Sequence, residues 1–166
     1  MGAGVHGGFG NTQGSRRNHS LKKGKFHSQH VNHTRESLLR ELDGQTPTSS
    51  AIADKIRRQE IKINVLDDNL FNRYLGYDNH TLAVTVGKQV YLRKNSASII
   101  SELVHEGQHA LDFIHGIKES SIRTWPGEIR AYKAEREFQM KTKRPVDFAN
   151  ENDLLVHVWR NYKREE

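Results

Sequence analysis

Two histidines four residues apart, inside one amphipathic segment, constrain the fold of this chain more than any other feature. The segment reads HEGQH from His105 to His109, and apolar residues recur around it at helical spacing between Ile100 and Ile114. On a helix, positions i and i+4 lie about 40° apart and about 6 Å along the axis. The spacing therefore predicts a helix over residues 97–115 that buries one side and presents both imidazoles on another.

The same segment fits the H-E-x-x-H pattern, in which two histidines hold a zinc ion and the glutamate between them moves a proton. Glu106 follows His105 on the same flank, where its carboxylate can reach a water molecule on the metal rather than the metal itself. The serines of residues 96–98 offer an N-cap, and Gly116 offers a stop. The alternative is an ordinary amphipathic helix that carries two surface histidines.

The composition is that of one domain with a modest core, since the chain has 166 residues and 34% hydrophobic content. The net charge of +6 permits contact with nucleic acid, acidic protein or a membrane surface, and it selects none of them. No cysteine is present, which excludes disulfides and thiolate zinc sites. This absence favours a reducing compartment, or a protein that unfolds to cross a membrane.

The N-terminal residues 1–35 differ from the rest of the chain. They are rich in Gly, His, Asn, Ser and basic residues and lack apolar periodicity, which predicts a flexible leader or linker. Residues 36–166 form the predicted folded domain. No apolar run approaches the roughly 20 residues of a membrane span. The N-terminus also lacks the apolar core of a secretory signal.

The folded part alternates short helical and strand patterns, which predicts an α+β fold. Residues 61–65 form a predicted strand, and residues 81–86 and 89–93 form a predicted antiparallel hairpin that packs on the motif helix. A loop with Pro47 is predicted over residues 45–50, followed by a helix that Ser49 or Ser50 caps. Helices are predicted over residues 37–42, 51–60, 70–75, 128–142 and 152–162. In the last helix, the residues predicted to face inward are Leu154, Leu155, Val158 and Trp159.

A catalytic zinc usually has three protein ligands, so the pattern requires one more. Glu128 is the first choice, because it opens the next long helix and the small Ala131, one turn on, lets that helix pack closely. Glu135 lies two turns later on a similar face. It is the alternative ligand, or else a hydrogen-bond partner of a ligand or a surface residue in a salt bridge.

His115 falls where the H-E-x-x-H-x-x-G-x-x-H pattern places a third histidine. That pattern needs a glycine at position 112 to turn the chain, and Asp112 occupies it. Without the turn, His115 is predicted to point away from the other two histidines, near the C-terminus of the helix. Asp112 is predicted either to accept a hydrogen bond from a ligand imidazole or to lie on the surface.

These residues together predict hydrolysis of a peptide bond. Zinc lowers the pKa of a bound water molecule and polarises the scissile carbonyl, while Glu106 takes the water proton and delivers it to the leaving amine. Tyr132, one turn after Glu128, is the candidate donor to the oxyanion, and a buried packing tyrosine is the alternative. The strand segment 90–92 either pairs with an extended substrate or only covers the motif helix.

The residues from His105 to Asp112, followed by Glu128, Ala131 and Tyr132, resemble the zincin metallopeptidases whose third ligand is a glutamate. The closest likeness is to the small metallopeptidase domains at the C-termini of bacterial polymorphic toxins, and it covers about residues 80–140. It implies a compact zincin-like fold and a catalytic zinc with Glu128 as third ligand. It also implies delivery by a specialised bacterial system, a protein substrate in the target-cell cytoplasm and a cognate immunity protein.

Three functions are compatible with these features. The first is a zinc endopeptidase that acts as a toxin or effector domain. The second is a metal-dependent nuclease or other hydrolase that uses the basic surface to hold nucleic acid. The third is an inactive zincin fold used for binding, which the intact His105, Glu106 and His109 disfavour. Glu106 between the two ligands favours amide hydrolysis, whereas the basic charge is only permissive.

Overall fold

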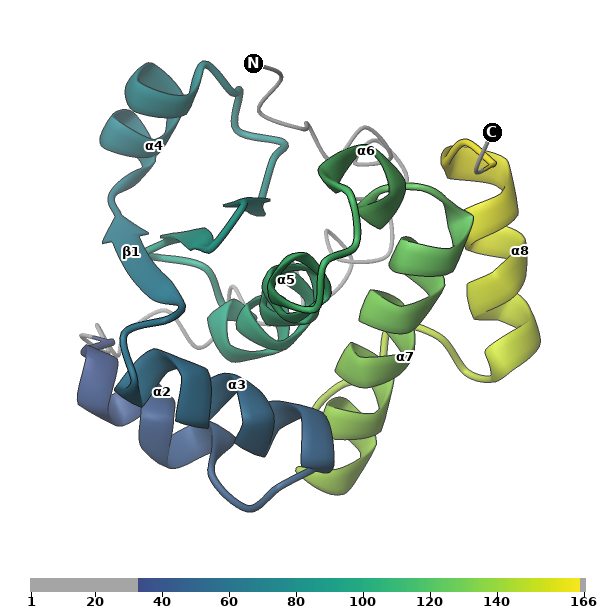
Figure 1. Ribbon diagram of the computed structural model, residues 1–166, viewed down its shortest axis with the longest axis horizontal. Helices are drawn as coiled ribbons and strands as arrows, with labels where there is room; N and C mark the ends of the chain where they lie inside the picture. Colours follow the sequence, from purple (N-terminus) through teal and green to yellow (C-terminus); the bar gives the residue numbers. More distant parts are fainter. Residues whose placement is uncertain (1–32, 165–166) are drawn as a thin grey trace.

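The computed structural model describes residues 33–164, so the predicted leader lies outside it except for residues 33–35. Within the described residues, seven helices and a three-stranded sheet confirm the predicted α+β class. The helices are α2 (Arg35–Leu42), α3 (Pro47–Arg57), α4 (Asp68–Leu75), α5 (Ile99–Ile114), α6 (Glu119–Ile122), α7 (Trp125–Lys141) and α8 (Glu151–Asn161). The strands are β1 (Lys62–Leu66), β2 (Ala83–Val86) and β3 (Gln89–Arg93), as Figure 1 shows in part. No helix among the described residues is long and apolar enough to span a membrane.

The first two helices begin at threonine caps. The Thr34 side chain accepts a hydrogen bond from the backbone N–H of Ser37, which starts α2. Thr46 caps α3 in the same way, with Pro47 in the first turn. Proline fits that turn because the first N–H groups of a helix have no partner within it. The predicted loop over residues 45–50 is therefore wrong for residues 47–50, and the N-cap is neither Ser49 nor Ser50.

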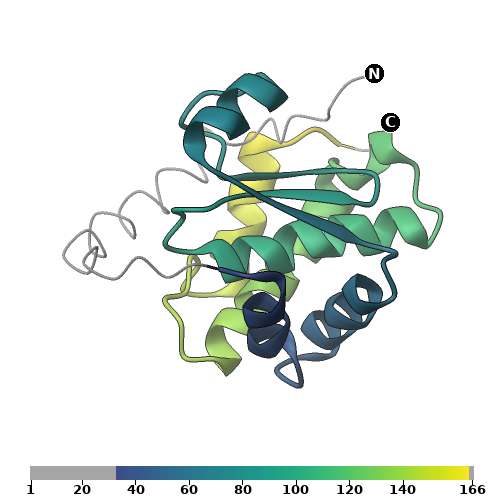
Figure 2. The same cartoon turned by 90° about the vertical axis from the view of Figure 1, so that its left-hand side faces the viewer.

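The sheet has the strand order β1-β3-β2. β2 and β3 form the predicted hairpin, with Thr85 opposite Val90. β1 pairs with β3 in parallel, with Ile63 opposite Val90, so the sheet is mixed rather than purely antiparallel. Parallel strands need a crossover connection, and α4 lies within it. Figure 2 shows the sheet between α4 and α5.

The motif helix α5 lies at the centre of the core, in contact with the sheet, α3 and α7 (Figures 1 and 2). Gly107 lets α3 approach closely, since a Cβ at that position would lie 2.6 Å from Cδ1 of Ile52. Leu103 is fully buried, and His105 and His109 are buried as well. The alternative of two surface histidines on an ordinary helix is therefore wrong.

Helix α8 covers α7 and builds a second apolar cluster. Leu154 and Val158 are buried against Tyr132, and Leu155 packs at the edge of this cluster. Trp159, predicted to face inward, is 51% exposed. Leu154 and Val158, four residues apart, already fill the narrow face of α8 that meets α7, so Trp159 lies beside that face.

Candidate metal centre

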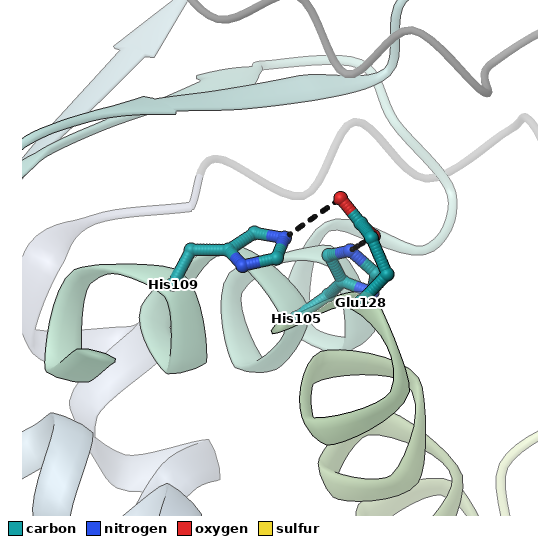
Figure 3. A group of neighbouring side chains, drawn as sticks. All are labelled: His105, His109 and Glu128. Carbon is teal, nitrogen blue, oxygen red and sulfur yellow. Dashed lines mark ion pairs between the residues drawn. The ribbon is translucent and has the colours of Figure 1, made fainter. Parts of the chain in front are cut away.

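Two imidazoles and one carboxylate meet where α5 packs against α7. His105 and His109 extend from one face of α5, and Glu128 reaches them from the first turn of α7 (Figure 3). Nε2 of His105 lies 3.4 Å from Oε2 of Glu128. Nε2 of His109 lies 3.5 Å from Oε1 of the same carboxylate. One potential ligand atom from each residue lies within 4.8 Å of the other two, and all three residues are buried.

These separations suit a bound metal ion. Ligand atoms about 2.1 Å from a tetrahedral zinc ion lie about 3.4 Å from one another, which is close to both nitrogen–oxygen distances. Two imidazole nitrogens and a carboxylate oxygen are also a ligand set typical of catalytic zinc. The group formed by His105, His109 and Glu128 can therefore hold a metal ion.

A tight turn between α6 and α7 positions Glu128. α7 begins at Trp125, three residues before the predicted start at residue 128, so Pro126 and Gly127 belong to its first turn. A Cβ on Gly127 would lie 1.6 Å from the backbone oxygen of Ile122. Only glycine fits such a close approach between two backbone segments.

Replacing Gly127 by alanine should therefore disrupt the start of α7 and displace Glu128. Because the obstructing atom belongs to the backbone, no side-chain rotation relieves the clash. We expect the free energy of unfolding of the metal-free protein to fall by about 3 kcal/mol, as measured by urea denaturation. Pro126→Ala, at the exposed neighbouring position, is the control and should lose much less. Equal stability of Gly127→Ala and the wild type would contradict the tight turn.

Glu135 contacts His105 at Nδ1, the imidazole nitrogen that does not face Glu128. Its Oε2 lies 3.1 Å from Nδ1 of His105, and both residues are buried. Gln139 approaches the other oxygen of Glu135 at 3.4 Å and donates to Asp147. An Nδ1–H that donates to Glu135 leaves Nε2 facing Glu128 and available to a metal ion. Of the roles predicted for Glu135, its placement fits that of a partner to a ligand.

The two carboxylates also control the protonation of His105. Burial disfavours the charged imidazole, yet hydrogen bonds with Glu128 and Glu135 raise the pKa of His105 to about 10. In the metal-free protein at neutral pH, this imidazole is therefore positively charged, with a proton on each nitrogen. A metal ion that binds Nε2 must displace the proton on that nitrogen, so metal affinity should rise with pH.

Replacing Glu135 by glutamine should weaken zinc binding without removing a ligand. The amide is similar in size but lacks the negative charge that polarises Nδ1–H of His105. We expect the zinc dissociation constant to rise by about 10–100-fold, measured by competition with a fluorescent chelator. Glu137→Gln, at an exposed position on the same helix, should bind zinc as the wild type does. Unchanged affinity in Glu135→Gln would show that the contact with His105 has no effect on the metal.

Glu106, the predicted base, is buried beside strand β2. The Thr85 hydroxyl lies 2.7 Å from Oε2 of Glu106 and 2.9 Å from its backbone oxygen. A hydroxyl that donates to the carboxylate holds it in one orientation. Sequence reasoning did not find Thr85, because a threonine inside a strand pattern carries no local sign of a contact with a helix that follows it.

The Tyr132 side chain lies between His105 and Tyr162 and contacts both. Its ring packs edge-on against the His105 ring, with 4.4 Å between the centroids. Its hydroxyl lies 2.9 Å from the hydroxyl of Tyr162. This placement favours the packing tyrosine over the predicted oxyanion donor, since the hydroxyl meets the C-terminal end of the chain.

Neither polar residue at the end of α5 belongs to the group formed by His105, His109 and Glu128. His115 is exposed at the C-cap, as expected where Asp112 replaces the turning glycine. Asp112 is buried and accepts hydrogen bonds from Arg130 and Gln108. Both predictions for Asp112 therefore differ from its observed role, which is to join α5 to α7 through Arg130.

The hairpin contributes to the candidate centre through β2 and not through β3. Residues 90–92 belong to β3, which pairs with β1 on one side and with β2 on the other. Its backbone is therefore occupied, and the predicted pairing of this segment with a substrate is wrong. The other prediction, that the hairpin covers α5, is confirmed. β2 is an edge strand, and its Thr85 contacts Glu106.

No family model, curated protein or solved structure matches this chain. Its function is therefore inferred from the geometry and chemistry of its own residues.

Proposed function

We propose that this chain is a zinc-dependent endopeptidase with a zincin-like site. His105, His109 and Glu128 would hold the ion, and Glu106 would act as the general base. The observation that carries the proposal is the group of ligand atoms within 4.8 Å of one another, next to a buried glutamate on the same helix. Two histidines and a glutamate leave one position of a tetrahedral zinc open for a reacting oxygen.

When bound, zinc would acidify a water molecule and polarise the scissile carbonyl. Glu106 accepts the proton as the water oxygen bonds to the carbonyl carbon and the electron pair of the C=O bond moves onto its oxygen. When the C–N bond breaks, Glu106 returns the proton to the leaving nitrogen. The Thr85 hydroxyl holds the carboxylate of Glu106 for both transfers, and Glu135 holds His105.

Hydrolysis of fluorescently labelled casein by the purified chain tests this function. We expect cleavage with stoichiometric zinc, loss of cleavage after chelation with EDTA, and recovery when zinc is restored. RNA and plasmid DNA are incubated under the same conditions. Zinc-dependent cleavage of either nucleic acid, with casein left intact, would contradict the endopeptidase and support the nuclease.

The likeness to toxin metallopeptidase domains adds a proposal about the setting. We propose that the chain is delivered into a target cell, cleaves a protein in its cytoplasm and is inhibited by an immunity protein. Expression of the wild type in the cytoplasm of a bacterium should then arrest growth, whereas Glu106→Gln should not. Equal growth of the two strains would contradict the toxin setting without bearing on the chemistry.

A further inference from the structure

Arg123 is linked to the predicted base through Thr85, and part of its guanidinium has no hydrogen-bond partner among the described residues. It is the C-cap residue of α6, and its Nη2 donates to the backbone oxygen of Thr85. The hydroxyl of the same threonine contacts Glu106. Nε and Nη1 of Arg123 are buried, and no described residue accepts a hydrogen bond from them. Thr85 thus links the two residues, since its backbone oxygen contacts Arg123 and its hydroxyl contacts Glu106.

Tyr77 lies in the connection between α4 and β2, and its hydroxyl is buried without a hydrogen-bond partner among the described residues. Burial raises the pKa of Tyr77, the positive charge of Arg123 opposes that rise, and the carboxylate of Glu106 adds to it. The phenol therefore keeps its proton at neutral pH. Tyr77 thus lies within electrostatic range of both Arg123 and Glu106.

Buried donors without an acceptor, such as those of Tyr77 and Arg123, favour the binding of an oxygen ligand. Burying an N–H or O–H group without a partner costs free energy, and such groups in native proteins have a functional reason or bind a missing partner. A guanidinium has donors only. Together with a protonated phenol it suits a negatively charged oxygen better than a cation or an apolar group.

We infer that Tyr77 and Arg123 form an oxygen-binding recess beside Glu106, which receives the carbonyl oxygen of the scissile bond as it becomes negatively charged. This inference rests on the proposed endopeptidase function for the identity of the oxygen. Donors fixed before the reaction stabilise a developing charge at little cost of reorganisation. The pair takes the role that the sequence had suggested for Tyr132, whose hydroxyl lies against Tyr162 instead.

Two variants with matched controls test the recess. Tyr77→Phe removes the hydroxyl alone, and Arg123→Lys keeps the positive charge while changing the set of donors. Arg123→Gln is left out, because losing both the charge and the bond to Thr85 endangers folding of the edge strand. The controls are Tyr74→Phe and Arg160→Gln, both at exposed positions. Zinc content is measured for every variant.

The first readout is binding of methylphosphonate, a tetrahedral oxyanion, to the zinc-loaded protein by calorimetry. The second is the split between kcat and KM for casein hydrolysis. Each recess variant should bind methylphosphonate at least about tenfold more weakly and lose about 100-fold in kcat, with KM and zinc content near the wild type. The controls should match the wild type in both readouts.

Binding of methylphosphonate decides the inference independently of hydrolysis. If both recess variants lose less than about tenfold in affinity for methylphosphonate, or if the wild type does not bind it, the inference is overturned even when casein is cleaved. If the wild type cleaves no casein yet both recess variants lose the oxyanion, the recess stands and the proposed peptidase function fails.

Discussion

Replacing Glu106 by glutamine should lower the rate of casein hydrolysis by about 1,000-fold while zinc content stays at the wild-type level. Glutamine has nearly the same shape, and its amide oxygen can still accept the hydrogen bond from Thr85. It cannot take a proton from water at neutral pH. The ligands His105, His109 and Glu128 are unchanged, so the variant separates the base from the metal site.

The comparison needs both the rate and the metal content. Zinc is measured by elemental analysis on the same samples that are assayed, and Glu137→Gln controls for loss of one exposed glutamate charge. A Glu106→Gln variant that cleaves casein at the wild-type rate would show that Glu106 is not the base. A variant without zinc would show that Glu106 belongs to the ligand set.

The parts of the site that depend on local spacing could be predicted from the sequence. The helical repeat fixes His105 and His109 on one face of α5 regardless of what packs around them. The position of Glu128 required more, because it depends on how α7 meets α5. The small Ala131 and the likeness to zincins pointed to it, and the structure brings Glu128 to both histidines.

The supporting residues could not be found in this way. Thr85, Tyr77 and Arg123 come from a strand, a connection and the end of a short helix. Thr85 contacts Glu106, and Arg123 contacts Thr85, only after the chain folds. Nothing in the local pattern around any of them marks a contact so distant in sequence. The parallel pairing of β1 with β3 was not predicted for the same reason, since the sequence pattern of a strand does not specify which strand it pairs with.

Two errors share a different physical cause. The pattern predicts a loop at Pro47 and a helix that starts only after Pro126, yet both prolines lie in the first turn of a helix. Proline breaks the interior of a helix but suits its start, where the missing N–H has no intrahelical partner. Threonine precedes the first turn in both cases, and Thr46 caps α3 through its side chain.

Replacing Glu128 by alanine should have the second large effect, the loss of zinc binding. Glu128 is fully buried, and its two oxygens face Nε2 of both histidines. Without this carboxylate, two neutral imidazoles would have to hold the ion alone. We expect the zinc dissociation constant to rise by more than about 100-fold, beyond the effect of losing a residue that only contacts a ligand, such as Glu135.

The most direct test of the metal centre is therefore the zinc affinity of Glu128→Ala beside that of the wild type, measured by chelator competition, with circular dichroism as the check on folding. Glu137→Ala, the exposed control on the same helix, should bind about one zinc ion per chain as the wild type does. A folded Glu128→Ala that has lost zinc is the predicted result. A folded Glu128→Ala that binds zinc as tightly as the wild type would contradict the centre formed by His105, His109 and Glu128.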